Sequence, residues 1–259
     1  MEPALAHHPT SWPADVTTLS IDIGGSGLKA ALLDPDGLMS TERVRVETLY
    51  PCPPELLVTT LTELVAPLPH YDRVSVGFPG MVRHGIVLDV PSLSRQVPGG
   101  PPWPPSVAAW NHFDLRSALE QALGRPTRVS NDADMQGCAV VRGDGMEFVM
   151  TLGTGCGTAL FYDGIKLPHL ELSHGPFRKS ETFDIQLGDL ARHEVGNERW
   201  SRRVVKALQA FDDMLFFDRV YVGGGNARKL TVDLGPKAVL VDNTAGIVGG
   251  VTIWELGSL

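Results

Sequence analysis

The chain has 259 residues, of which 43% are hydrophobic and 20% are charged, and these proportions are ordinary for a globular protein with a sizeable core. The net charge of −8 argues against nucleic-acid and membrane partners, and no apolar run reaches the roughly 18 residues of a membrane span. The three cysteines, Cys52, Cys138 and Cys156, form no Cys-x-x-Cys pair, so neither a disulfide framework nor a zinc cage is indicated. We therefore expect a protein of the cytoplasm.

The first elements form a β-meander. Residues 1–17 predict a loose leader, and an apolar strand then begins at Thr18 and ends in the glycine turn Gly24-Gly25-Ser26-Gly27. A second strand is expected from Leu28 to Leu33 and a third around residues 43–47. Glycine at a sharp corner between aliphatic runs is typical of β-hairpins.

Helices and strands then alternate. Pro53-Pro54 opens a helical pattern to about Val65, and residues 73–78 read as a buried strand. The proline-rich segment from Pro91 to Pro105 predicts a long loop. Asp114 caps a helix that Gly124 ends, and a strand over residues 127–130 leads into Asn131-Asp132.

The second half repeats the opening theme. A strand over residues 147–152 runs into the glycine turn Gly153-Thr154-Gly155-Cys156-Gly157, and the chain returns as a strand over 158–162. The remaining predicted elements are a long helix over 187–216, a strand over 219–222 that ends in Gly223-Gly224-Gly225, a short strand over 238–241 and a helix over 245–256.

This repetition predicts a duplicated α/β fold. Strand, glycine turn and strand occur twice, about 130 residues apart, which is the sequence form of two related lobes. We expect an N-terminal lobe over 18–131, joined by the returning C-terminal helix at 245–257, and a C-terminal lobe over 132–244. The chain would cross between the lobes near 131–132 and again near 243–245.

The three glycine turns predict phosphate binding. Because glycine lacks a Cβ, its backbone can approach a phosphate and direct N–H groups at it. A single glycine turn after a strand is more often only a hairpin, but three in one chain favour the phosphate interpretation. There is no Gly-Lys-Ser/Thr P-loop, and the first two turns lead into strands rather than helices, unlike a dinucleotide site.

Six motifs, which follow one another along the chain, resemble those of one known protein family. They are Asp22-Ile-Gly-Gly-Ser-Gly-Leu-Lys29, Gly77-Phe-Pro-Gly80, Asn131-Asp132-Ala-Asp134, Leu152-Gly-Thr-Gly-Cys-Gly157, Glu171-Leu-Ser-His174 and Gly223-Gly-Gly225. Together they resemble the ROK family of bacterial sugar kinases and repressors, over roughly residues 18–256. The Asn-Asp-Ala-Asp form, the run Val82-Arg83-His84-Gly85 and the short length are similar to the polyphosphate glucokinase branch. The resemblance implies the actin-like, ribonuclease H-like fold, with two lobes and a cleft between them.

The resemblance also implies a phosphotransferase site. Phosphoryl transfer needs a positioned acceptor hydroxyl, a carboxylate to take its proton and a metal-bridged phosphate. Asp132 matches the family's general base, and Asp22 matches the carboxylate that holds Mg²⁺ through water. The residues matched to sugar binding are Gly80, Asn131, Glu171 and His174. Those matched to the phosphates are Gly24, Gly25, Ser26, Gly27, Lys29, Gly153, Thr154, Gly155, Gly157, Gly223, Gly224 and Gly225. Taken alone, Asp132 is more readily a helix cap, His174 a surface histidine and Lys29 a solvated strand residue.

The sequence departs from the family at several positions, one of which is Gly175-Pro176, which follows His174 where the family usually has an acidic residue. The cysteine run that holds a structural zinc in most members is absent, so we expect no zinc, which again favours the polyphosphate branch. Ser173 replaces the usual glycine before His174, and Asn226 follows the third glycine turn where an aliphatic residue is usual. The sugar-binding asparagine of the family has no clear match in the loop from Pro91 to Pro105, so the sequence leaves sugar identity and affinity open.

The phosphoryl donor also stays open between polyphosphate and ATP. Arg199, Arg202, Arg203 and Lys206 recur at helical spacing and would form one basic stripe. A solvated face balanced by Glu194 and Glu198 is favoured over a polyphosphate track.

The expected function is a hexokinase or glucokinase of carbohydrate metabolism, with Mg²⁺ as cofactor, a hexose and polyphosphate or ATP as substrates, and glucose as the expected acceptor. An ATP-dependent kinase of another or an N-acetylated hexose is the alternative within this class. A ROK-type regulator would need a DNA-binding module of roughly 60 residues, and only about 20 residues precede Asp22. A non-catalytic sugar sensor is disfavoured because Asp22, Asp132 and the glycine turns are retained. The number of subunits stays open, with a homodimer as one possibility.

Overall fold

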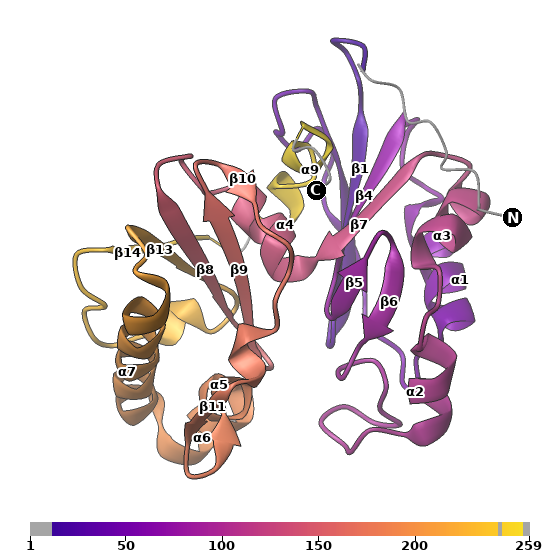
Figure 1. Ribbon diagram of the computed structural model, residues 1–259. Coiled ribbons are helices and arrows are strands. Elements are labelled where there is room, and N and C mark those ends of the chain that lie inside the picture. The colour runs from indigo at the N-terminus through magenta and orange to yellow at the C-terminus, as the bar shows by residue number, and fades with distance from the viewer. Residues whose placement is uncertain (1–11, 243–244, 256–259) are drawn as a thin grey trace, which may run out of the picture.

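The computed structural model describes residues 12–242 and 245–255, and two five-stranded sheets dominate them (Figure 1). The first sheet comes from the first half of the chain. Its strands, in spatial order, are β3 (Val44–Val46), β2 (Gly27–Leu33), β1 (Thr18–Gly24), β4 (Arg73–Phe78) and β7 (Thr127–Asn131). β1 and β2 form an antiparallel hairpin, whereas β1, β4 and β7 are parallel.

The second sheet repeats this pattern. Its order is β10 (Ile165–Lys166), β9 (Cys156–Tyr162), β8 (Met146–Leu152), β13 (Arg219–Gly223) and β14 (Ala238–Leu240). β8 pairs antiparallel with β9 and parallel with β13, as β1 does with β2 and β4. Each half of the chain therefore supplies a hairpin with a glycine turn at its tip, followed by parallel strands. The predicted duplicated α/β fold is confirmed.

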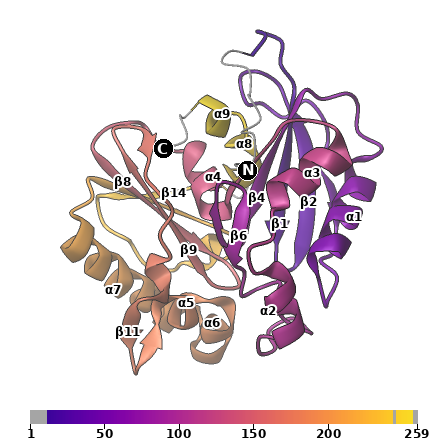
Figure 2. The same ribbon diagram turned by 45° about the vertical axis from the view of Figure 1, so that its right-hand side comes forward.

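Helices surround the two sheets (Figures 1 and 2). Beside the first sheet lie α1 (Pro54–Val65), α2 (Pro104–Trp110) and α3 (Leu115–Leu123), and beside the second lie α5 (Phe183–Leu187), α6 (Asp189–Val195) and α7 (Asn197–Leu215). Between the sheets lie α4 (Asp132–Cys138), α8 (Ala245–Val248) and α9 (Thr252–Glu255). The small hairpins are β5 (Met81–Arg83) with β6 (Ile86–Asp89) and β11 (Pro176–Arg178) with β12 (Glu181–Thr182), and short 3-10 turns cover Leu172–His174 and Ala227–Lys229.

Helix α7 illustrates how the sequence builds the core of the second half. Its buried residues Trp200, Val204, Ala207 and Phe211 recur at helical spacing. The ring of Phe211 packs against Phe183 with the centroids 4.4 Å apart. Burial of such large aromatic side chains stabilises the fold by about 2 kcal/mol each.

The chain's last described segment returns to the first sheet. Ser20 Oγ of β1 donates to Ile247 O at 2.7 Å, and Trp254 Nε1 donates to Ser75 Oγ of β4 at 2.8 Å. Gly249 lies against α4 so closely that an added Cβ would stand 1.8 Å from Met135 O. Glycine at this position therefore allows the C-terminal segment to dock between the sheets.

Several predicted boundaries were wrong, each for a local reason. The helix expected over 187–216 is broken into α6 and α7 at Gly196, whose φ of 78° leaves the helical region. The helix expected over 245–256 is two short helices, α8 and α9, and residue 256 lies outside the described residues. Helix α2 begins at Pro104, inside the expected loop, because proline is favoured in the first helical turn. The β5–β6 hairpin and α4 were not predicted as elements.

The leader prediction was wrong for residues 12–17, whereas residues 1–11 lie outside the described residues. Val16 is buried, and the ring of Trp12 packs edge-on against Trp254 at 5.2 Å. An aromatic partner thus holds a segment whose prolines suggested disorder. The second predicted crossing near 243–245 falls at residues 243–244, which are also outside the description. No helix within 12–242 or 245–255 is both long and apolar enough to span a bilayer.

Candidate active site

Asp132 lies at the junction between β7, the last strand of the first sheet, and α4. It is the first residue of the helix, and Asn131 is the N-cap. The backbone N–H of Ala133 donates hydrogen bonds to Asn131 Oδ1 at 2.7 Å and to Asp132 Oδ1 at 2.9 Å. Asn131 Nδ2 also donates to Gly80 O at 3.1 Å, so three of the predicted site residues meet at this strand end.

The surroundings of Asp132 favour a carboxylate that can take up a proton. Burial, first, and the negative charge of Asp22, second, raise its pKa from 3.8 to about 7. The Ala133 N–H and His169 act in the opposite direction, and Glu171 adds a further small increase. A carboxyl group with a pKa near the working pH is suited to general-base catalysis.

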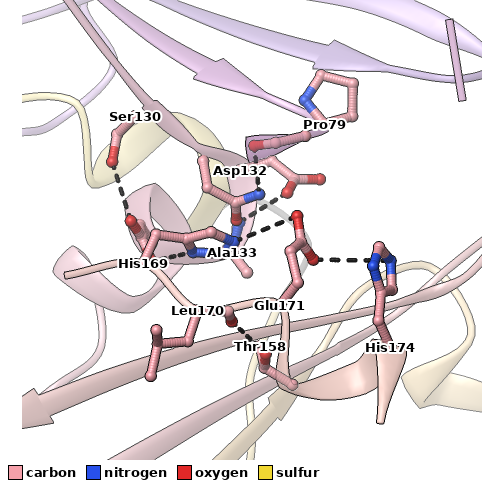
Figure 3. A network of polar contacts seen from close by, with 12 residues as sticks. Pro79, Ser130, Asp132, Ala133, Thr158, His169, Leu170, Glu171 and His174 are labelled. Atoms are coloured by element: carbon pink, nitrogen blue, oxygen red, sulfur yellow. Dashed lines mark hydrogen bonds and ion pairs between the residues drawn. The ribbon is translucent and has the colours of Figure 1, made fainter. Parts of the chain in front are cut away.

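Glu171 and His174 also converge on this region (Figure 3). Glu171 precedes the 3-10 turn that contains His174, and its Oε2 lies 3.8 Å from His174 Nε2. Its other oxygen, Oε1, lies 3.5 Å from Nε2 of His169. Burial alone would raise the pKa of Glu171, but the imidazole of His169 outweighs this and lowers it.

Sequence reasoning missed the buried network behind Glu171. Asp134 on α4 is 1% exposed, and it contacts His169 Nδ1 at 2.9 Å and Lys166 Nζ at 3.2 Å. Burial alone would lower the pKa of His169, but its contacts with Asp134 and Glu171 raise it to about 9. The available signal was the i, i+2 spacing of His169 and Glu171, which places both side chains on one face of an extended segment.

The first glycine turn is held by side chains that bind its backbone carbonyl groups. Tyr50 and Thr48 donate their hydroxyls to Gly25 O at 2.7 Å and to Gly24 O at 2.6 Å. Near the tip of the hairpin, Asp22 and Lys29 face each other in the strand register, and Lys29 Nζ lies 2.7 Å from Asp22 Oδ2. The structure therefore pairs the predicted metal-binding carboxylate with the predicted phosphate-binding lysine.

The second and third glycine turns are packed against one another. Asn226 donates its Nδ2 to Gly153 O at 2.9 Å and its backbone N–H to Leu152 O at 2.9 Å. Gly224 has a φ of 85°, and a Cβ there would lie 2.4 Å from Leu152 O. The asparagine that departs from the family pattern thus links the two turns. Two N–H groups of the second turn are already taken, because Gly153 N donates to Gly155 O at 2.9 Å and Cys156 N donates to Asp184 Oδ1 at 2.7 Å.

Comparisons with known proteins identify the family of this chain. Residues 18–167 match the sequence model of the ROK family. The chain belongs to the ROK family. It is 27% identical to the polyphosphate glucokinase of Mycobacterium tuberculosis (strain ATCC 25177 / H37Ra) over 245 residues, which cover 88% of each chain. It is 35% identical to the N-acetylmannosamine kinase of Escherichia coli (strain SE11) over 154 residues, which cover 58% of this chain and 48% of that one.

A solved structure matches nearly the whole ROK chain. The inorganic polyphosphate/ATP-glucomannokinase of Arthrobacter sp. strain KM superposes with a TM-score of 0.81 and 28% identity, over 93% of this chain and 99% of that one. The chain therefore has the actin-like two-lobe fold of ROK sugar kinases.

The Mg²⁺ ion that the ROK resemblance implies fits the residues near the tip of the first hairpin. Mg²⁺ is usually bound through one or two carboxylates plus substrate phosphates. Asp22 supplies a partly exposed carboxylate, and its repulsion of Asp132 is one cause of the raised pKa there. A cation at Asp22 would relieve that repulsion. The three cysteines, in contrast, are buried in three separate clusters of the core, so they do not converge as thiolate ligands.

Hydrogen bonds to its own backbone carbonyl groups hold the proline-rich segment over 91–105 in shape. Arg95 Nε donates to Pro91 O at 2.9 Å, and Trp103 N donates to Ser94 O at 2.7 Å. A cavity of about 340 Å³ lies beside this segment, and its walls include Val90, Pro102 and Trp110. None of the predicted sugar-binding residues is among those that line it, but Asp89 and Val90 of its wall lie against Gly80.

The basic residues of α7 do not form one continuous stripe. Arg202 is exposed and pairs with Glu198 at 2.9 Å, whereas Arg203 is only 8% exposed on the packed side of the helix. The pairing of Arg202 agrees with the solvated-face interpretation of this helix.

Proposed function

We propose that this ROK chain is a hexose kinase that transfers a phosphoryl group from polyphosphate or ATP to a hydroxyl of glucose. The observation that carries the proposal is the carboxyl group of Asp132, whose pKa is raised to about 7 at the point where Gly80, Asn131 and Glu171 meet. Groups suited to a sugar therefore surround a carboxylate suited to taking a proton.

In the proposed reaction, Asp132 accepts the proton of the acceptor hydroxyl while that oxygen attacks the terminal phosphorus of the donor. The bond from this phosphorus to the bridging oxygen breaks, and the shortened polyphosphate or ADP leaves. Glu171, His174 and the remaining amide hydrogen of Asn131 bind sugar hydroxyls. The backbone N–H groups of the glycine turns bind the phosphates.

Mg²⁺, when bound at Asp22 with the donor, supplies positive charge that screens the phosphates. Lys29 would then contribute in two ways: it holds the Asp22 carboxylate in place and adds positive charge near the hairpin tip. The names of two relatives support the proposed donor and acceptor: one is a polyphosphate glucokinase and the other is a polyphosphate/ATP-glucomannokinase.

A second acceptor class is supported by one observation. The N-acetylmannosamine kinase of E. coli is 35% identical over its matched region, which is a higher identity over a shorter span. An N-acetylated hexose is therefore the alternative acceptor.

A coupled assay tests the proposal. Purified protein with Mg²⁺ is given glucose, mannose, N-acetylglucosamine and N-acetylmannosamine, each with ATP and with long-chain polyphosphate. We expect the highest kcat/KM with glucose and turnover with at least one of the donors. Turnover restricted to N-acetylated sugars would replace glucose by the alternative class, and no turnover with any pair would refute the kinase proposal.

A further inference from the structure

His169 occupies an unusual place for a titratable side chain. It lies between β10 and the turn that carries Glu171 and His174, and its side chain is only 3% exposed. Nδ1 donates to Asp134 Oδ1 at 2.9 Å. Nε2 forms no hydrogen bond with any residue that the structure describes, but it is directed at Glu171 Oε1, 3.5 Å away. A buried N–H without an acceptor costs free energy, so a small approach of Glu171 would be favourable.

The charges around His169 favour the imidazolium form. Asp132, Asp134 and Glu171 place three carboxyl groups in this region, and Asp22 adds a fourth that acts on Asp132. The basic side chains that face them are Lys166, His169 and His174, the last of which lies 3.8 Å from Glu171 Oε2. Asp134 is itself buried and needs positive partners. A positively charged His169 therefore balances Asp134 on one side and Glu171 on the other.

His169 connects two parts of the site that are distant in sequence. Asp134 is two residues after Asp132 on α4, and Glu171 is two residues after His169. His174, by comparison, is 43% exposed and can contact a ligand directly. The route from base to sugar-binding carboxylate thus runs through α4, Asp134 and the imidazole ring. Figure 3 shows the ring of His169 beside Glu171.

We propose that His169 is a positioning residue of the sugar site: its imidazolium ties Glu171 to the helix that carries Asp132, and so fixes the distance between the sugar-binding carboxylate and the base. This inference rests on the proposed hexose kinase function. It also supplies a fixed anchor for the sugar in a chain whose sugar loop departs from the family pattern.

The direct test is His169→Gln, with His70→Gln as the matched control. His70 also contacts an aspartate, Asp72, at 3.2 Å, but it is 69% exposed and distant from α4. We expect His169→Gln to raise the Kd and the KM for glucose by about 10- to 100-fold, with the KM for the donor unchanged within about twofold. His70→Gln should leave every constant unchanged.

A double-mutant cycle separates positioning from general structural damage. If His169 acts through Glu171, then His169→Gln should weaken glucose binding by less than about twofold once Glu171→Gln is present. The same loss in both backgrounds would overturn the proposal, and so would unchanged glucose binding in His169→Gln alone.

A measurement on the wild-type protein does not depend on variants that fold. Nitrogen-detected NMR of the histidine rings at pH 7.5 should show His169 with both nitrogens protonated, and its Nε2 signal should shift when glucose is added. A neutral ring at this pH would overturn the proposal. Failure of the kinase function has a different signature: the wild type would neither bind nor phosphorylate any hexose, and the His169 proposal would then be overturned with it.

Discussion

Replacing Asp132 by asparagine should reduce turnover and increase stability at the same time. General-base catalysis contributes about 10²- to 10⁴-fold, and the amide of Asn cannot take the proton. The fold should tolerate the change, because Asn retains an acceptor for the Ala133 N–H and the N-cap Asn131 accepts the same group. Glucose binding should therefore be largely intact while kcat falls by at least about 100-fold.

The stability gain follows from the pKa. The folded value of about 7 lies above the unfolded value of 3.8, so ionisation of Asp132 is disfavoured in the fold. The resulting penalty is absent below about pH 4, grows as the pH rises to about 7 and is complete above it. A shift of about three pKa units corresponds to ~4 kcal/mol at most. Asp132→Asn removes this penalty.

Denaturant unfolding at pH 5 and pH 8, together with steady-state turnover, measures both effects. Asp132→Asn should be more stable than wild type at pH 8, and the difference should be smaller at pH 5. Asp134→Asn is the control on the same helix, and it should lower stability by about 3 kcal/mol because it leaves the buried His169 and the half-buried Lys166 without their carboxylate partner. A variant that keeps more than about a tenth of wild-type turnover, or one with no gain at pH 8, would refute the reasoning.

Three further predictions concern the metal, the C-terminal segment and lobe closure. Elemental analysis of protein purified without chelators should find no zinc, and activity should require Mg²⁺; about one zinc per chain would contradict this. Gly249→Ala should lower the free energy of unfolding by about 3 kcal/mol, because the new Cβ would overlap Met135 O; an unfolding midpoint equal to that of wild type would argue against the docking described. Hexose binding should close the lobes and exclude water, so saturating glucose should slow amide exchange around Gly80 and Glu171, and identical exchange with every sugar would count against closure.

The fold was predictable because its signals are local. Each glycine turn follows an apolar strand, and hairpin geometry depends on the residues at the corner. The pairing of Asp22 with Lys29 could also have been predicted, since the turn that joins Gly24 to Gly27 sets these two residues opposite one another. The break at Gly196 was missed because helical periodicity continues on both sides of it.

The residues of the candidate site could be predicted only where they belong to a sequence motif. Asp132, Glu171 and His174 belong to ordered motifs, whereas the basic partners of Asp134 come from a segment more than 30 residues away. No spacing rule links such residues before the fold is known. The same holds for Asn226, whose contact with Gly153 depends on the packing of two separate turns.

The pH dependence of phosphoryl transfer tests the central claim most directly. Single-turnover transfer to saturating glucose is measured from pH 4.5 to 9 with wild type and Asp132→Asn. The wild-type rate should rise with pH to a plateau, with a midpoint between about 5 and 7, because burial raises the pKa of Asp132 and Mg²⁺ at Asp22 removes part of the increase. The variant should be slow at every pH. A wild-type rate that is flat over this range, or a variant that retains the same rise, would contradict the assignment of Asp132 as the base.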